Sequence, residues 1–260
     1  MTGVARVLSK WGICSRTSAA LWVKSGRVQV NGRVVRDPER AVDVGRDVVR
    51  VDGLEIRPAE RITIMLNKPR GLVTTASDEK GRPTIYDCLD DVSLPWLAPV
   101  GRLDRASEGL LLMTNDPEFA ATVTDPDAGP PKVYHVQVTP KPDAGLPTIL
   151  RRGVVDKGEA LRAAHATILR EGRRSGWLEI VLHEGRNRQI RRMLTAAGHR
   201  VDRLVRIAIG GLELGALAKG RWRRLDAADL EALRQDVFPS LVRGASEAAM
   251  RRARNASGAS

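Results

Sequence analysis

The sequence predicts a protein of two domains, each of which combines short helices with short strands. Three observations lead to this fold class. The chain has 260 residues, enough for two modest domains that each bury a core. Some segments repeat apolar residues at helical spacing, while others alternate apolar and polar residues as half-buried strands do. The first 36 residues differ from the rest because they carry seven Lys or Arg side chains and no Asp or Glu.

The first elements are two helices followed by a tight hairpin. Apolar residues at helical spacing predict a helix over residues 4–11, which Gly12 ends. Ser15 is a suitable N-cap for a second helix, and Gly26 stops that helix. Two valine-rich strands then flank Asn31-Gly32. Asn-Gly between two strands predicts a two-residue hairpin turn, because both central residues must adopt positive φ.

Domain boundaries follow from these elements and from composition. A strand over residues 48–51 completes the first module, so we place the N-terminal domain at residues 1–55. Residues 56–61 are polar, contain a proline and are expected to form a linker. The second domain is placed at residues 62–236. Residues 237–260 carry arginines among Ala, Ser and Gly and are expected to form a basic, disordered tail, with loose RNA contact or no role as equal alternatives.

Charge and hydropathy narrow the class of partner. The chain has 43 Lys and Arg against 31 Asp and Glu, a formal net charge of +12, which favours a polyanion and above all a nucleic acid. No apolar run approaches 18 residues, so we expect no membrane association. The N-terminus lacks a signal-peptide core, so we expect a cytoplasmic protein.

Potential metal ligands and thiols are few and scattered. Cys14 and Cys88 lie far apart without the spacing of a zinc or disulfide motif, and the four histidines form no ligand pattern. The sequence therefore predicts neither a metal site nor a disulfide framework.

The segment with the clearest chemical content runs from Gly101 to Asp116. It places Asp104 between Arg102 and Arg105, just ahead of an apolar run that predicts a buried strand. A carboxylate beside guanidinium groups stays ionised, which suits a nucleophile or general base better than a proton donor. Considered alone, such an aspartate is more often half of a structural ion pair.

Two further strands carry candidate site residues. Residues 62–66 predict a strand that runs into a loop containing Lys68 and Arg70. Residues 132–138 alternate with period two and place Tyr134 on the face of Val136 and Val138. A tyrosine on a sheet usually serves packing, but beside a nucleotide pocket it can stack on a base.

A cluster of arginines follows a third strand, predicted over residues 178–182. Ile190, Met193, Leu194 and Ala197 are spaced as the core-facing stripe of a helix. Four arginines are expected in the first turns of this helix: Arg186, Arg188, Arg191 and Arg192. Cations are unfavourable at a helix N-terminus, so the positive charge is expected to serve a phosphate or a buried carboxylate, with a solvated basic helix as the alternative.

Together these segments resemble the RsuA/RluB/RluE/RluF group of RNA pseudouridine synthases, from about Val4 to about Leu233. The resemblance rests on four motifs in the order of the family: Leu66-Asn67-Lys68-Pro69-Arg70-Gly71, Gly101-Arg102-Leu103-Asp104 with Ser107-Glu108-Gly109-Leu110-Leu111, Lys132-Val133-Tyr134, and Glu184-Gly185-Arg186-Asn187-Arg188-Gln189-Ile190-Arg191. It implies an α+β catalytic domain with a mixed, largely antiparallel sheet and a central cleft. Ahead of that domain it implies a small αL-type RNA-binding domain like that of a ribosomal small-subunit protein.

The resemblance also implies the reaction, which is isomerisation of uridine to pseudouridine in RNA without cofactor or metal. It assigns Asp104 as the catalytic aspartate, acting at C1′ as a nucleophile or at C2′ as a base, with Arg191 as its ion-pair partner. Tyr134 is expected to stack on the target base, and Arg102 to fill the space that a flipped uridine leaves. The remaining residues expected to bind substrate are Leu103, Lys68, Arg188 and Leu204.

The N-terminal domain is expected to contact phosphates without reading sequence. The residues expected to do so are Arg6, Arg16, Lys24, Arg27 and Arg33. The preferred substrate is large-subunit rRNA, and the chain is expected to act as a monomer. The alternatives are a small-subunit rRNA or tRNA pseudouridine synthase, a non-catalytic RNA-binding ribosome assembly factor, and a DNA-binding regulator.

Overall fold

The computed structural model describes residues 1–89 and 94–235, so the tail predicted for residues 237–260 lies outside the described residues. The N-terminal part opens with the two predicted helices, α1 (Val4–Lys10) and α2 (Arg16–Lys24). The Ser15 hydroxyl caps α2 by accepting a hydrogen bond from the Ser18 amide at 3.0 Å. No helix within residues 1–89 and 94–235 is long and apolar enough to span a bilayer.

Short strands complete the N-terminal domain. A four-stranded sheet has the order β3-β2-β5-β6, and β1 pairs with β4. Their bounds are β1 Thr2–Gly3, β2 Val28–Val30, β3 Arg33–Val35, β4 Ala41–Val42, β5 Val49–Val51 and β6 Leu54–Glu55. Asn31 and Gly32 have φ values of 51° and 78°, which confirms the predicted hairpin turn. Buried valines, alanines and Leu8 form a core that belongs to this domain alone.

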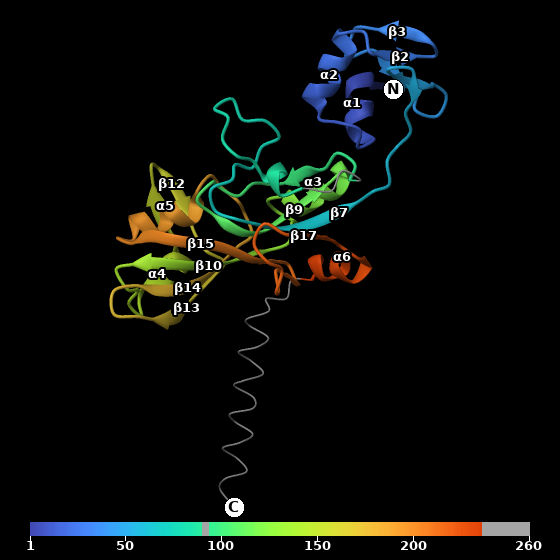
Figure 1. The fold of residues 1–260 in the computed structure, drawn as a ribbon. Coiled ribbons are helices and arrows are strands. Elements are labelled where there is room, and N and C mark those ends of the chain that lie inside the picture. The colour runs from blue at the N-terminus through green and yellow to red at the C-terminus, as the bar shows by residue number, and fades with distance from the viewer. Residues whose placement is uncertain (90–93, 236–260) are drawn as a thin grey trace, which may run out of the picture.

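The second domain is built on one nine-stranded sheet (Figure 1). Its main path is β13-β14-β10-β15-β9-β7-β17, with β8 paired to β9 and β16 paired to β15. The bounds are β7 Thr63–Lys68, β8 Ala98–Val100, β9 Glu108–Thr114, β10 Lys132–Thr139, β13 His165–Glu171, β14 Gly176–Leu182, β15 Arg200–Ile209, β16 Leu212–Glu213 and β17 Trp222–Arg224. The β9–β15 pair is parallel, and the other strand pairs of this sheet are antiparallel. The expected mixed, largely antiparallel sheet is thus confirmed.

The sheet has a core on each face, and β9 contributes to both. Leu111 and Met113 pack into the core beneath α4 (Leu146–Arg152) and α5 (Gln189–Ala196), as successive strand residues point to opposite faces. Leu110 and Leu112 pack into the core beneath α3 (Pro117–Thr124) and α6 (Ala227–Leu233). All seven residues of β9 are buried, which explains the uninterrupted apolar run that the sequence shows there.

The parallel contact between β9 and β15 depends on a glycine. Gly109 has a φ of 101°, and a Cβ at this position would lie 2.2 Å from the carbonyl oxygen of Arg206. Only a residue without a side chain allows the two backbones to approach this closely. The loop that precedes β9 is therefore brought against β15 at the centre of the sheet.

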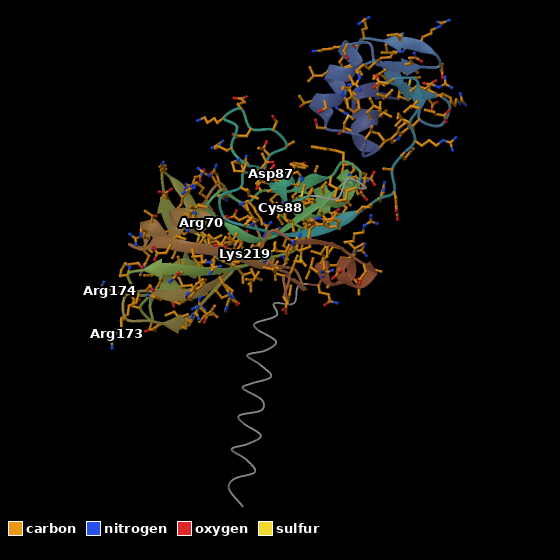
Figure 2. The ribbon with its side chains drawn as sticks, in the orientation of Figure 1. Arg70, Asp87, Cys88, Arg173, Arg174 and Lys219 are labelled. Atoms are coloured by element: carbon orange, nitrogen blue, oxygen red, sulfur yellow. The ribbon has the colours of Figure 1, made fainter. Side chains whose placement is uncertain are left out.

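The second domain also contains smaller elements outside the nine-stranded sheet. A hairpin of β11 (Val154–Asp156) and β12 (Glu159–Leu161) follows α4, and a 3₁₀ helix spans Ile85–Cys88. Figure 2 shows Arg173 and Arg174 at the tip of the β13–β14 hairpin, apart from Arg70 and Lys219 nearer the middle of the sheet.

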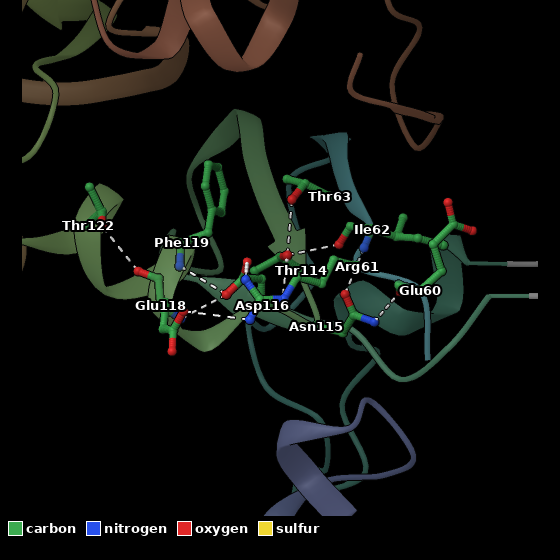
Figure 3. Close-up of polar contacts among 10 residues, drawn as sticks. All are labelled: Glu60, Arg61, Ile62, Thr63, Thr114, Asn115, Asp116, Glu118, Phe119 and Thr122. Atoms are coloured by element: carbon green, nitrogen blue, oxygen red, sulfur yellow. Dashed lines mark hydrogen bonds and ion pairs between the residues drawn. The ribbon is translucent and has the colours of Figure 1, made fainter. Parts of the chain in front are cut away.

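The linker is fastened to the end of β9 by a buried asparagine (Figure 3). The Asn115 side-chain oxygen accepts from the Ile62 amide at 2.8 Å, and its nitrogen donates to the Glu60 carbonyl at 2.7 Å. Arg61 pairs with the neighbouring Asp116 at 2.8 Å. These contacts fix the direction in which the chain enters β7.

The N-terminal domain meets the second domain at the end of α1. The Trp11 carbonyl accepts from the Ala59 amide, and the Gly12 carbonyl accepts from the Trp96 amide, both at 2.9 Å. Gly12 has a φ of 71°, and a Cβ there would lie 2.8 Å from the Asn115 side-chain nitrogen. Gly12 thus ends the helix, as predicted, and permits close contact between the domains.

Candidate active site

A small pocket lies where the loop before β9 meets β10, β15 and the start of α5. Its volume is about 90 Å³. It is lined by Arg102, Leu103, Asp104, Ser107, Tyr134, Leu182, Gly185, Arg186, Arg188, Gln189, Ile190, Arg191 and Leu204. The structure thus brings together seven of the eight residues that the sequence placed in the catalytic and substrate-binding site.

The loop that carries Asp104 is held by its backbone carbonyls. The Thr74 hydroxyl donates to the Leu103 carbonyl at 2.7 Å, and the Ser107 amide donates to the Asp104 carbonyl at 2.9 Å. The Gly71 amide donates to the Arg105 carbonyl at 2.8 Å, and Arg105 returns a hydrogen bond to the Gly71 carbonyl at 3.1 Å. The carboxylate is therefore presented by a backbone that has little freedom to move.

Lys68 does not line the pocket, and its expected place among the substrate-binding residues needs correction. The side chain is fully buried, and its ammonium lies beneath the loop. Its Nζ donates to the carbonyls of Ser107, at 2.9 Å, and of Asp104 and Pro69, each at 3.2 Å. Burial lowers the pKa of Lys68 to about 8, against the opposing charge of Asp104. Lys68 thus supports the loop from below rather than meeting a ligand.

Two arginines face the Asp104 carboxylate, whose side chain is 36% exposed. Arg188 Nη1 lies 3.5 Å from Asp104 Oδ2, and Arg191 Nε lies 4.0 Å from the same oxygen. The sequence proposed Arg191 as the ion-pair partner, whereas Arg188 is the nearer of the two in this structure. Both cations keep the carboxylate in a positive environment.

Arg191 is half-buried, and its guanidinium donates hydrogen bonds to two backbone carbonyls. It donates to the Ala106 carbonyl at 3.2 Å and to the Val201 carbonyl at 3.4 Å, while its Nε has no hydrogen-bond partner among the described residues. Burial, and then the charge of Arg188, lower the pKa of Arg191 from its ordinary value. Arg191 is thus another support of the Asp104 loop, with one donor left facing the pocket.

The arginine cluster is arranged differently from the prediction. The helix begins at Gln189, so Arg186 and Arg188 precede it, and Arg188 adopts a left-handed backbone with φ 50°. Within the helix, Arg192 turns away from the pocket and pairs with Asp156 at 2.5 Å and Glu159 at 2.7 Å. Apolar spacing marks the buried face of a helix but not its first residue, so it did not separate the two arginines that precede the helix from the two within it.

Apolar side chains and one tyrosine form the walls of the pocket. Tyr134 lies on β10, with Val136 and Val138 on the same face as predicted, and it is buried beside Leu103 and Leu204. Arg102 is exposed at the mouth. A flat ring could enter between the apolar walls with its edge toward Asp104.

A buried carboxylate with two cationic partners lies at the start of the strand that follows the loop. Glu108, the first residue of β9, is 3% exposed and binds Arg203 at 2.9 Å and Lys219 at 2.5 Å. Burial favours a higher pKa for Glu108, but the hydrogen bonds from Arg203 and Lys219 outweigh it and hold the pKa below its ordinary value. The sequence did not identify this triad, since Lys219 lies in a segment without a motif.

The basic residues of the N-terminal domain lie outside the pocket. Arg16 faces Glu39 at 3.6 Å, and Arg27 binds Asp52 through Nε at 3.0 Å while covering the ring of Trp22. Arg6, Lys24 and Arg33 are exposed. The charge on this domain is therefore partly neutralised by acids that follow residue 36.

The described residues contain no group of three His, Cys, Asp or Glu side chains arranged to hold a metal ion. The pocket instead offers a fixed carboxylate, two guanidinium groups, a tyrosine ring and apolar walls. Such a set can hold an uncharged ring and act on an atom attached to it through the carboxylate.

Two family models match the chain. The model of the RNA pseudouridylate synthase family matches residues 62–196, and that of the S4 domain matches residues 3–48.

Known proteins resemble the chain over most of its length. It is 40% identical over 236 residues to an uncharacterized RNA pseudouridine synthase of Mycobacterium tuberculosis, covering 89% of this chain and 92% of the relative. It is 36% identical to the ribosomal large subunit pseudouridine synthase B of Bacillus subtilis, covering 90% and 96%. A crystal structure of a pseudouridylate synthase matches with a TM-score of 0.65 at 26% identity, covering 90% of this chain and all of that one.

Proposed function

The chain belongs to the RNA pseudouridine synthase family, and on that premise we propose that it isomerises one uridine of large-subunit rRNA, with Asp104 as the catalytic residue. The observation that supports this most is the position of Asp104. Among the described residues that line the pocket it is the one carboxylate, and the loop that carries it is held along its backbone carbonyls. The ribosomal substrate is suggested by the Bacillus subtilis relative. An rRNA substrate would place the activity in the cytoplasm.

The proposed reaction conserves every atom of the nucleotide. The N1–C1′ bond of the target uridine breaks, the uracil turns within the pocket, and a C5–C1′ bond forms. The proton lost from C5 is balanced by a proton gained at N1, and Asp104 is restored when it leaves C1′ or returns the proton to C2′. Asp104 begins the reaction at the ribose, either by attack on C1′ or by removing a proton from C2′. For either role the carboxylate must be ionised, and two guanidinium groups face it, with Arg188 Nη1 at 3.5 Å and Arg191 Nε at 4.0 Å from Oδ2.

The pocket walls suit the base that has to turn. A cavity of about 90 Å³ leaves room for a single ring and little water, so the base must leave its stack to enter. Tyr134 can stack on the ring while Leu103 and Leu204 bound it, and none of these three groups bears a charge that would fix one orientation of the uracil. Exposed Arg102 at the mouth can occupy the gap that the flipped base leaves.

The decisive experiment maps pseudouridine across all rRNA and tRNA from cells with and without the gene, complemented with wild type or with Asp104→Asn. One large-subunit position should lose pseudouridine on deletion and regain it only with wild type. A position in small-subunit rRNA or tRNA would correct the substrate. No change at any RNA position would instead favour a non-catalytic assembly factor.

A further inference from the structure

A second hollow opens directly beside the active-site pocket. We call it the α4 groove, because it is bounded by the end of α4, the β11–β12 hairpin and the loop ahead of α5. Its volume is about 880 Å³, roughly ten times that of the pocket. Arg186 lines both hollows, so the groove lies directly next to the pocket.

The α4 groove carries positive charge that the described residues leave largely unneutralised. Among the described residues that line it, Glu184 is the one acid. Four arginines line it as well: Arg151, Arg152, Arg162 and Arg186. Arg186 is bound to Glu184 at 2.8 Å, and Arg151 donates to the Thr148 hydroxyl at 3.2 Å. Arg152 and Arg162 are exposed and have no carboxylate partner in the part of the chain that the structure describes.

The acids of the neighbouring hairpin have another partner. Asp156 and Glu159 belong to the β11–β12 hairpin, and both bind Arg192 on α5. Neither carboxylate is paired with an arginine of the α4 groove, so the groove beside the pocket keeps its positive charge.

We propose that the α4 groove binds the sugar-phosphate backbone of the RNA strand on one side of the target nucleotide. The inference rests on the proposed function, since the pocket accommodates one base and the chain attached to that base must leave it. Arg186, shared by pocket and groove, marks an exit toward two unpaired cations. A phosphodiester carries one negative charge per nucleotide and fits such cations without any need to read the sequence.

The test compares two pairs of exposed arginines that carry the same charge. The groove pair is Arg152→Ala/Arg162→Ala, and the control pair is Arg173→Ala/Arg174→Ala at the tip of the β13–β14 hairpin (Figure 2). The probe is a labelled oligouridylate of about 12 nucleotides, within the usual range of single-strand sites. Its Kd is measured from low to high salt on the full chain.

The groove pair should flatten the slope of log Kd against log salt by about 1.4, because each phosphate contact with a single strand contributes about 0.7. The control pair should leave the slope unchanged. Arg152→Lys/Arg162→Lys should restore it, since a phosphate contact requires the charge more than the guanidinium shape. Melting temperatures of all variants should agree, which separates a binding effect from a folding one.

Equal slopes for the groove and control pairs would reduce the effect to net charge and overturn the proposal, as would an unchanged slope in the groove pair. This readout does not depend on catalysis. Loss of the proposed function would show as missing pseudouridine with the slopes as expected. A groove that binds no RNA would show as an unchanged slope in an active enzyme.

Discussion

The two domains use positive charge in opposite ways. In the N-terminal domain the cations are on the surface, where the side chains of Arg16 and Arg27 are 59% and 43% exposed and face acids. In the catalytic domain the two cations that support the Asp104 loop are largely buried: the Lys68 side chain is not exposed at all, and that of Arg191 is 15% exposed. Lys68 and Arg191 are bound mainly by backbone carbonyls rather than by carboxylates.

Exposed cations and buried cations therefore have different roles: the first attract a polyanion, and the second hold part of the protein in position. An exposed cation draws a polyanion from solution, but salt screens it and a neighbouring acid reduces its effect. A buried cation is shielded from salt and is costly to desolvate, so it persists where it holds something that must not move. In this chain, Lys68 and Arg191 hold the loop that carries Asp104. We therefore expect changes at buried cations to alter rate and changes at exposed ones to alter affinity.

The largest effect should come from Asp104→Asn, which tests whether the buried arrangement serves chemistry at all. The amide keeps the shape but can neither attack C1′ nor take a proton, so product should fall to background while RNA affinity stays within a few-fold. Single-turnover formation of pseudouridine and filter binding measure the two quantities. Asp127→Asn, an exposed aspartate of the same domain, is the matched control. Half of the wild-type activity in Asp104→Asn would remove the catalytic assignment.

Lys68→Met should have the next largest effect, because it removes the ammonium but keeps most of the buried stem. The carbonyl of Ser107 loses its Lys68 donor and the loop can shift, and a displacement of about 1 Å can reduce a rate by about 100-fold. The desolvation penalty of the ammonium disappears at the same time, so the melting temperature should change little. Lys141→Met provides an exposed control. An unchanged kcat in Lys68→Met would show that the loop holds its position without this cation.

The pH dependence should distinguish positioning from stability, because the two respond in opposite directions. As pH rises through about 8, Lys68 loses its proton and one of its donors, so kcat should fall. The free energy of unfolding should instead rise between about 8 and the ordinary lysine pKa of 10.5, because the unfolded chain keeps the proton that the folded chain has released. Below pH 8 both states are protonated and the penalty of burial is constant.

Unfolding in urea at pH 7 and pH 9.5, together with a pH–rate profile, measures both trends. Burial and the charge of Arg206 also lower the pKa of Lys132 to about 8, so part of the stability change should persist in Lys68→Met. The fall in rate should be absent from that variant. A profile of the same shape in wild type and Lys68→Met would assign the titration to another group.

The smallest effect is expected from substitutions in the N-terminal domain. Two pairs of them compare free surface cations with cations that already face acids. Arg6→Ala/Lys24→Ala removes two exposed cations and should flatten the salt dependence of RNA binding by about 1.4 to 1.8, with kcat unchanged. Arg16→Ala/Arg27→Ala should change the slope less, because Glu39 and Asp52 already oppose those charges. Equal slopes for the two pairs would mean that RNA displaces the acids.

Local sequence was sufficient for several of the elements. The Ser15 cap, the Asn31-Gly32 turn and the alternation around Tyr134 each depend on residues a few positions apart, and the structure contains all three. Of the eight site residues expected from the resemblance to the synthase family, seven line the pocket, and all of these except Leu204 lie in its motifs.

Other features were decided only when distant segments met. Lys68 lies 36 residues from Asp104, Arg188 lies 84 residues from it, and Lys219 lies 111 residues from Glu108. The acceptors that hold the Asp104 loop are backbone carbonyls, which every residue possesses, so no residue type marks them in the sequence. The choice of Arg188 over Arg191 as the nearer cation likewise depends on one left-handed residue ahead of α5. By itself the sequence determined the elements and the chemical groups of the site, whereas the tertiary structure decided which groups face the pocket and which hold it in place.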